Sequence, residues 1–413
     1  MFKFILKQKV YLFLVLMIGM IASCSSDDDM VIGDITSPTG ELTKTIPWDE
    51  TEASISFTAN SAWEASVAEV GTRAATSISW LKITVPKGGA GDVKMPLFLS
   101  KNDNETYREA EVTIKCGEKC VTVTIHQEAN PDAVKMMDVS AISNYSMYIT
   151  PGTWNEGFEK GPDYMLRSDA RWSWWRMKQS EHFFVFWEPG FGDDPNAESV
   201  PEALRVDVDD LLQKAEQFYK TNVEKLGMAT VGQGKSVLDN HKMQIYLLYQ
   251  TDWLATGSGY DDKIGALWVN PSTCKPVGST IGHEIGHSFQ YQVSADKLFT
   301  GEVTPIDRAD GSQLVPAGFR YGFGENGAGG CAYWEQCAQW QSFQDYPNEC
   351  FDQDAHYGVW LKNHHRHFNH GFMRYASYWF QYWFTEKHGI ESYARIWKES
   401  KYPEDPLQTY MRI

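Results

Sequence analysis

The stretch that decides how the larger part of this chain folds reads Ile281-Gly282-His283-Glu284-Ile285-Gly286-His287-Ser288-Phe289-Gln290. It contains the pattern His-Glu-x-x-His. Residues four apart lie on the same face of an α-helix, so His283 and His287 would offer two imidazoles to one metal ion. Glu284 would lie beside that face, where it can reach a metal-bound water without being a ligand, as the general base of zinc hydrolases does. The spacing therefore predicts a metal-binding helix.

The other residues of this stretch form the remaining faces of the helix. Ile281, Ile285 and Phe289 form an apolar face, as a buried helix needs. Gly282 and Gly286 each lower helix stability by about 1 kcal/mol relative to alanine, so a helix that carries both is expected to pack closely against its neighbours. The alternative interpretation is an ordinary amphipathic helix with two core histidines.

A catalytic zinc ion needs a third protein ligand and an open position for water. Metzincins supply a histidine ten residues after the first one, with glycine at seven. Val293 and Gln290 occupy these places here, which excludes that class. Gluzincins instead use a glutamate on a second helix, and the helical segment 333–340 offers Glu335, 48 residues after His287.

Glu335 stands between large apolar residues, where a carboxylate is costly to bury unless a cation or a hydrogen-bond donor compensates its charge. We therefore predict His283, His287 and Glu335 as ligands of Zn²⁺. Glu325, in a glycine-rich loop, is the rival third ligand, and an exposed Glu335 on an amphipathic helix is the alternative without a metal. Thermolysin-like enzymes often carry an aspartate four residues after this glutamate to orient a histidine ligand, and Gln339 stands there instead.

Length and composition set the broad class of protein. The 413 residues suffice for two or three domains, and 42% hydrophobic residues with 14% aromatics supply a packed core, which excludes a disordered chain. The net charge of −17 argues against nucleic acid or an anionic membrane face as a partner.

The N-terminal segment has the features of an export signal. Three lysines precede an apolar run at 10–21, which is too short for a comfortable membrane span. The run ends in Ile21-Ala22-Ser23-Cys24, which resembles the lipobox of bacterial lipoproteins, and an acidic stretch follows, as in surface-displayed Bacteroidetes-type lipoproteins. The resemblance implies a signal peptide at 1–23, a lipid anchor at Cys24, an acidic tether at 24–40 and an outer-membrane location facing the cell exterior. The alternative is a secreted protein with an incidental Cys24.

Residues 41–129 are predicted to form an all-β sandwich, because short runs of alternating apolar residues are separated by turn residues. The segment resembles a BACON domain, an immunoglobulin-like module. The resemblance rests on Asn60-Ser61-Ala62-Trp63, Ser79-Trp80-Leu81, residues 104–108 ahead of Ala110, and the closing stretch 121–127. It implies carbohydrate as a partner, although tryptophans in small sandwiches, such as Trp63 and Trp80, are more often core residues. Cys116 and Cys120 flank a hairpin end, where a disulfide is conceivable.

The rest of the chain is predicted to be a linker at 130–150 followed by an α+β domain at 151–413. Strand patterns at 182–187, 243–249 and 266–269 and a long helix near 201–226 precede the metal helix. In thermolysin-like peptidases an edge strand in this place holds extended substrate. The region resembles a poorly characterised group of gluzincin-like domains that accompany BACON modules, which implies a zincin-like fold and a zinc hydrolase.

Other candidates for a role at the site lie near the C-terminus. The histidine-dense stretch 363–370 could stabilise an oxyanion or bind another metal, but a solvated loop is the simpler interpretation. Tyr375 and Tyr378 open a helical run at 374–387, and a tyrosine or histidine from this region would be a natural donor to a tetrahedral intermediate. The sequence does not select among them.

The sequence as a whole predicts a multidomain surface lipoprotein that acts as a zinc metallopeptidase on protein or glycoprotein substrates, with Glu284 as general base. The alternative is a non-catalytic, glycan-binding adhesive protein with a degenerate peptidase-like domain. Hydrolysis of a non-peptide bond would use the same ligands.

Overall fold

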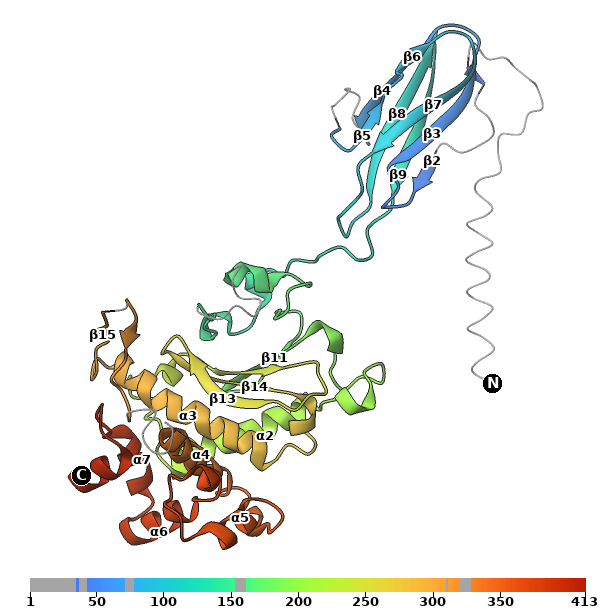
Figure 1. Cartoon of the computed structure of the whole chain (residues 1–413). Coiled ribbons are helices and arrows are strands. Elements are labelled where there is room, and N and C mark those ends of the chain that lie inside the picture. Colours follow the sequence, from blue (N-terminus) through green and yellow to red (C-terminus); the bar gives the residue numbers. More distant parts are fainter. Residues whose placement is uncertain (1–34, 37–42, 71–77, 153–160, 310, 320–327) are drawn as a thin grey trace, which may run out of the picture. The chain divides into compact units, whose positions relative to one another are not determined.

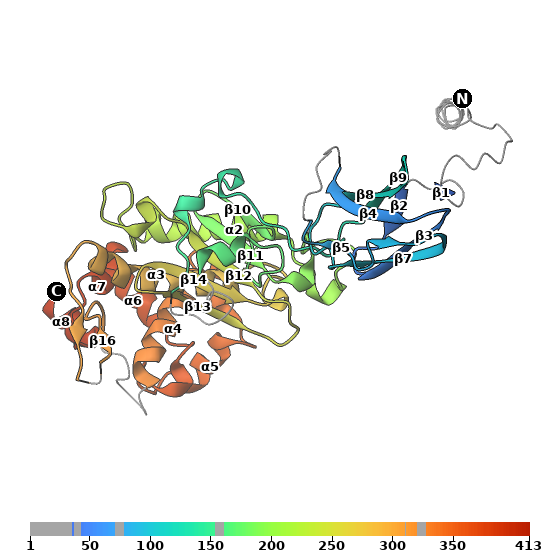
Figure 2. The same cartoon turned by 90° about the horizontal axis from the view of Figure 1, so that it is seen from above.

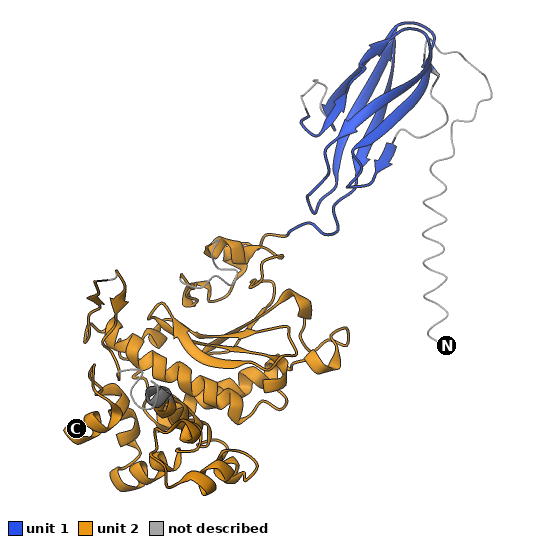
Figure 3. Ribbon diagram, in the orientation of Figure 1, with its two compact units in different colours: residues 1–134 blue, residues 135–413 orange. Residues whose placement is uncertain are grey.

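The structure, a computed structural model, describes residues 35–36, 43–70, 78–152, 161–309, 311–319 and 328–413. The chain divides into two compact units, Met1–Val134 and Lys135–Ile413 (Figure 3). The predicted signal peptide 1–23, the predicted lipidation site Cys24 and the rival ligand Glu325 lie outside the described residues. Among the described helices, none has both the length and the apolar character to cross a membrane.

The first unit consists of two β-sheets around a shared core, as the alternating pattern predicts (Figure 2). One sheet has the order β1-β3-β7-β5 and the other the order β2-β9-β8-β4-β6. The strands are β1 (Ile35–Thr36), β2 (Thr43–Ile46), β3 (Glu52–Ala59), β4 (Trp63–Glu69), β5 (Leu81–Ile83), β6 (Lys87–Gly88), β7 (Gly91–Leu99), β8 (Arg108–Cys116) and β9 (Lys119–Gln127). Every second residue of the long strands β7 and β8 is buried between the sheets, which is why the period-two pattern is visible in the sequence.

The tryptophans of this unit are held by intramolecular contacts. Trp63 is buried, and its ring meets Phe57 edge to face at 5.0 Å between centroids. Trp80 is half-buried, and the Arg108 guanidinium lies over its ring at 4.5 Å. Trp63 is therefore a core residue, and Trp80 already carries a cation on one face.

The conceivable disulfide between Cys116 and Cys120 does not fit the hairpin. Cys116 pairs with Lys119 and Lys115 pairs with Cys120 across strands β8 and β9. Side chains of successive pairs point to opposite faces of a sheet, so Cys116 is buried while Cys120 is exposed. The expectation of a bridge here was wrong, because the two thiols face away from each other.

The second unit begins inside the stretch 130–150 that the sequence predicts as a linker. Ile142 and Tyr148 of that stretch are buried in the core of this unit. Its five-stranded sheet has the order β10-β11-β12-β14-β13, in which β11, β12 and β14 are parallel and the two outer strands antiparallel. The strands are β10 (Met177–Gln179), β11 (Phe183–Trp187), β12 (Met243–Leu247), β13 (Ala255–Tyr260) and β14 (Ile264–Val269), and a separate small hairpin is formed by β15 (Ile306–Asp307) and β16 (Gln313–Leu314).

Every residue of β11, β12 and β14 is buried, and all but Gln244 on β12 are apolar, because both faces of the sheet are covered. On β11, the Phe183 ring meets Tyr219 of a helix at 6.0 Å. Phe184 and Phe186 both meet Trp174, at 5.7 and 5.2 Å. Neighbouring residues of the strand thus contact different layers, which explains a run of large apolar residues without polar alternation.

The helices of this unit lie in layers next to the sheet (Figure 1). They are α2 (Val208–Lys220), α3 (Ser279–Phe299), α4 (Ala328–Ser342), α5 (His356–Asn363), α6 (Trp379–His388), α7 (Glu391–Lys398) and α8 (Pro406–Arg412). Helix α3 packs on β13 and β14, α2 lies beside it, and α4 packs on α3 from the side away from the sheet. A mixed α/β region therefore follows the all-β unit.

The helix predicted near 201–226 begins later than expected. The Asp207 side chain accepts hydrogen bonds from the backbone N–H groups of Asp209 and Asp210, which fixes the start of α2 at Val208. A short π-helical turn (Thr221–Lys225) continues it to the predicted end.

Candidate metal centre

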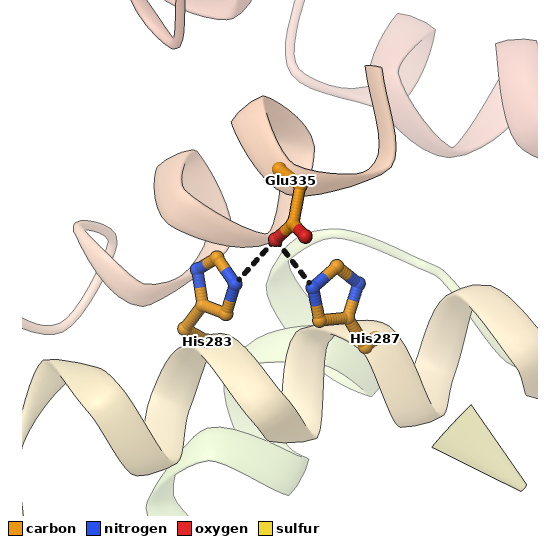
Figure 4. Close-up of side chains that lie close together, drawn as sticks. All are labelled: His283, His287 and Glu335. Atoms are coloured by element: carbon orange, nitrogen blue, oxygen red, sulfur yellow. Dashed lines mark hydrogen bonds and ion pairs between the residues drawn. The ribbon is translucent and has the colours of Figure 1, made fainter. Parts of the chain in front are cut away.

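The three predicted ligands meet at one point between α3 and α4 (Figure 4). His283 and His287 project from neighbouring turns of α3, with ring centroids 4.6 Å apart. Glu335 reaches down from α4, and its Oε2 atom lies 3.0 Å from the Nε2 atom of each histidine. The three donor atoms all lie within 4.8 Å of one another, so the group could hold one metal ion.

Close contact between the two helices makes this convergence possible. A Cβ atom on Gly286 would lie 3.2 Å from the Cα atom of Ala338 on α4. On another face of α3, a Cβ atom on Gly282 would lie 2.7 Å from the Phe218 ring of α2. The structure confirms the prediction that both glycines mark close packing, because larger residues would push α3 away from its neighbours.

Two glutamines orient the imidazoles. Gln339 Oε1 lies 3.1 Å from Nδ1 of His283, and Gln290 Oε1 lies 2.9 Å from Nδ1 of His287. An amide oxygen can only accept, so each Nδ1 carries a proton and each Nε2 faces the centre. Without a metal ion, a hydrogen bond from Nε2 to Glu335 Oε2 needs a proton on that nitrogen, and this proton would leave when a metal ion binds there. Gln339 thus makes the contact for which thermolysin-like enzymes often carry an aspartate, although the sequence left this role of Gln339 in doubt.

The charges at the centre favour a cation. Glu335 is largely buried, and burial alone would raise its pKa, but the hydrogen bonds and charges of His283 and His287 outweigh this and lower the pKa of Glu335 well below its ordinary value. Burial lowers the pKa of His287, and the hydrogen bond and charge of Glu335 raise it by more, so its net pKa is raised. An ionised carboxylate facing two imidazole nitrogens is the protonation state that binds a divalent metal.

Glu284 lies next to this group without belonging to it. Its side chain is buried, and its Oε2 atom accepts a hydrogen bond from the backbone N–H of Gly257 on the edge strand β13. A Cβ atom on Gly257 would lie 2.0 Å from the Glu284 carbonyl oxygen, so only glycine allows β13 to approach α3 this closely. The edge strand therefore holds the carboxylate in place.

Tyr375 is the tyrosine that the structure brings to the centre. Its hydroxyl donates a hydrogen bond to Glu335 Oε1 at 3.1 Å, and its ring stacks on His356 at 5.2 Å between centroids. Burial and the charge of Glu335 raise the pKa of Tyr375 to about 12, so it remains a proton donor at neutral pH. Burial, together with His283, lowers the pKa of His356.

The other C-terminal candidates lie elsewhere. Tyr378 is buried and donates a hydrogen bond to the Cys350 carbonyl oxygen at 2.6 Å. In the histidine-dense stretch 363–370, His364, His365 and His367 are exposed. His356, which sequence reasoning missed, is a single histidine without a motif around it.

The centre opens into a cleft of about 660 Å³. His283, Glu284, His287 and Glu335 line it together with Tyr375 and His356. Ala255, Thr256 and Gly257 of β13 form part of the same lining. The ligand group is thus accessible to a substrate that lies along the edge strand.

Comparisons with known proteins place the second unit in a family. A family model described as "Family of unknown function (DUF6055)" matches residues 139–413. No curated protein matches the chain significantly. A solved protein from Bacteroides thetaiotaomicron has 15% identity and a TM-score of 0.19 and covers 27% of this chain and 98% of its own. A Bacteroides ovatus GH5 xyloglucanase in complex with a XXXG heptasaccharide has 13% identity and a TM-score of 0.20; the match covers 75% of this chain but only 62% of the xyloglucanase. At these TM-scores neither likeness carries an argument.

Proposed function

This chain belongs to the DUF6055 family, whose function is unknown, and we propose from the site itself that it is a zinc-dependent hydrolase, namely a gluzincin-type metallopeptidase with a zincin-like second unit. The observation that carries the proposal is the convergence of two imidazole Nε2 atoms and one carboxylate oxygen beside an open cleft. Two nitrogens and one oxygen, with a further position left open, are the donor set of a catalytic zinc ion.

A bound zinc ion would lower the pKa of its water to near 7 and polarise the carbonyl group to be cleaved. His283, His287 and Glu335 would hold it. Glu284 takes the proton of the attacking water and passes it to the leaving amine. Because Gly257 N–H occupies one carboxylate oxygen of Glu284, the other oxygen is the proton acceptor.

Tyr375 supports the same reaction from beside Glu335. Its hydroxyl remains protonated at neutral pH and already points to Glu335. A hydroxyl in this place can donate to the oxyanion that develops on the attacked carbonyl group. Tyr375 is therefore the residue that we assign to oxyanion stabilisation.

The edge strand favours a peptide over other substrates. In the described sheet, β13 pairs with β14 on one side only, and three of its residues line the cleft. An extended polypeptide can add to such an edge through main-chain hydrogen bonds. We therefore propose protein or glycoprotein substrates.

Three proteins test this proposal: the wild type, Glu284→Gln and Glu335→Ala, each loaded with zinc and incubated with a mixture of unstructured peptides. We expect about one zinc ion per chain in the wild type and in Glu284→Gln, and much less in Glu335→Ala. Hydrolysis should occur in the wild type alone. Hydrolysis by zinc-loaded Glu284→Gln would refute the mechanism.

The competing proposal of a non-catalytic glycan-binding protein makes the opposite prediction. All three ligands, the general base and both orienting glutamines are present and in contact, which favours a working enzyme over a degenerate one. A chain without bound metal but with measurable affinity for oligosaccharides would favour the binder.

We further propose that the chain is an outer-membrane lipoprotein facing the cell exterior, with an immunoglobulin-like BACON module as its first unit. The support is the pattern that ends in Cys24 and the two-sheet architecture of that unit. Metabolic labelling with a palmitate analogue should mark the wild type and not Cys24→Ser. Equal labelling of both proteins would exclude the anchor.

A further inference from the structure

We propose that the cleft selects a peptide with a lysine or arginine just after the scissile bond and an uncharged residue just before it. This inference deepens the proposed function and rests on it for the position of the scissile bond. It follows from the different chemistry of the two cavities that meet at the metal centre.

The larger cleft carries negative charge beyond the catalytic group. Glu349, on a 3₁₀ turn (Pro347–Phe351), and Asp352, just after that turn, are both exposed and line it. None of the described lining residues is lysine or arginine. Arg374 lies 6.0 Å from the Tyr375 ring centroid but is not part of the lining. The two carboxylates would therefore attract a cationic side chain.

Glu349 is held close to the metal helix. The Ser279 hydroxyl, on the first residue of α3, donates a hydrogen bond to Glu349 Oε2. Ser279 and His283 are four residues apart and so lie on one face of α3, about 6 Å from each other along the axis. A long basic side chain next to the scissile bond can span this short separation between the centre and the carboxylate.

An exposed tryptophan adds a second element suited to a cation. Trp253 lines the same cleft, and 67% of its surface is exposed. The face of an indole ring attracts ammonium and guanidinium groups. A carboxylate and an aromatic face within one cleft suit lysine or arginine better than an apolar side chain.

The second cavity has the opposite character. It measures about 150 Å³ and shares Gly257 and His287 with the larger cleft, so it also begins at the metal centre. Its walls include Trp334 and Trp397, and apart from His287 it contains no lysine, arginine, histidine or carboxylate side chain among the described lining residues. A cavity of this size could hold a benzene-sized ring, so its polarity rather than its volume sets the preference, and it fits an uncharged side chain.

The direction of the edge strand orders the two subsites. Residues Ala255 and Thr256, at the start of β13, line the larger cleft, whereas Ser258 lines the smaller cavity. A peptide that pairs antiparallel with β13 places its N-terminal part beside Ser258 and its C-terminal part beside Ala255. The uncharged residue therefore precedes the scissile bond and the basic residue follows it.

The experiment compares zinc-loaded wild type with the double variant Glu349→Gln/Asp352→Asn on an unbiased peptide library. We expect the wild type to cleave before lysine or arginine and after uncharged residues. The double variant should lose about tenfold in kcat/KM on peptides with lysine after the scissile bond and keep its rate on matched norleucine peptides. Asp354→Asn, which removes an exposed charge from the same segment outside the cleft lining, should behave as the wild type.

A binding measurement separates failure of this inference from failure of the proposed function. Glu284→Gln protein is titrated with a lysine peptide and its norleucine counterpart, with and without the two cleft substitutions. Cleavage without any preference for basic residues after the bond, or a preference for charged residues before it, would overturn the inference and leave the hydrolase intact. If the wild type does not hydrolyse peptides but the Glu284→Gln protein binds the lysine peptide more tightly than the norleucine peptide, the hydrolase is overturned and the basic subsite is supported. Equal binding of the two peptides would overturn the basic subsite.

Discussion

Gln339 Oε1 lies 3.1 Å from Nδ1 of His283, one helical turn beyond Glu335 on the same helix. Helix α4 therefore supplies both the candidate ligand Glu335 and the group that orients the candidate ligand His283. The arrangement is repeated within α3, where Gln290 accepts from His287 Nδ1 and its own amide nitrogen donates to the Trp334 carbonyl oxygen. Nδ1 of each histidine is thus held by a glutamine side chain in the metal-free structure.

The first prediction concerns this orientation. Gln339→Leu should weaken zinc binding by about 10- to 100-fold, because the His283 ring loses the acceptor that fixes its tautomer and angle. Gln339→Asp should restore the affinity, since a carboxylate accepts the same hydrogen bond. Competition with a chelator measures both. Gln344→Leu, beyond the end of α4 and outside the cleft lining, is the control, and an unchanged affinity in Gln339→Leu would show that Gln339 has no such role.

The second prediction separates Tyr375 from Tyr378. Tyr375→Phe should lower kcat about 100-fold with zinc content unchanged, because a donor to the oxyanion is removed. Tyr378→Phe should leave kcat unchanged and lower the free energy of unfolding by about 1 kcal/mol, because its hydrogen bond to Cys350 is structural. Steady-state kinetics and thermal unfolding of the two variants make the comparison. Equal rates for Tyr375→Phe and the wild type would remove Tyr375 from the mechanism.

The ligand set could be predicted from the sequence because each of its signals is local. His283 and His287 are linked by the period of one helix, and Glu335 is marked by apolar neighbours that make an uncompensated carboxylate costly. The strands of the first unit were equally visible, since burial on one face imposes alternation. In each case the chemistry of neighbouring residues determines the structure.

The remainder of the site depends on tertiary contacts that leave no local signal. His356 is a single histidine that reaches the cleft because α5 folds back towards Tyr375, whereas the conspicuous stretch 363–370 is largely exposed. The same holds for the predicted linker, where Ile142 and Tyr148 are buried by partners distant in sequence. No periodicity of 3.6 or 2 residues marks such positions.

The third prediction concerns the metal-free protein and pH. The pKa of Glu335 is lowered from 4.5, so its contribution to stability is present above that value and is lost as pH falls through the folded-state pKa. The pKa of His287 is raised from 6.5, so its contribution is present below that value and is lost as pH rises through the folded-state pKa. With zinc chelated, the wild type should unfold at a higher temperature than Glu335→Gln, and this difference should be largest between about pH 4.5 and 6.5.

Thermal unfolding in a chelator across this pH range provides the measurement. The difference between the two proteins should narrow as the pH rises above 6.5 through the folded-state pKa of His287, because the His287–Glu335 ion pair is lost there. Glu224→Gln, which removes a carboxylate from the surface of the second unit, should differ little from the wild type at any pH. A difference between wild type and Glu335→Gln that grows with pH would contradict the assigned directions of the pKa shifts.

The last prediction tests the contact that joins the edge strand to the metal helix. Gly257→Ala should lower the free energy of unfolding by about 3 kcal/mol or more, because its Cβ atom would lie 2.0 Å from the Glu284 carbonyl oxygen, and backbone has little room to move. Gly318→Ala, whose Cβ atom would lie 3.5 Å from the Ser294 hydroxyl, makes only an ordinary contact and serves as the control. Denaturant unfolding of both proteins gives the free energies.

If β13 instead shifts outward in Gly257→Ala, part of the lost stability is recovered, but Glu284 loses the hydrogen bond from the Gly257 N–H. Hydrolysis should then fall even in the folded protein. Gly257→Ala protein with wild-type stability and wild-type activity would show that the close approach of β13 to α3 is not required.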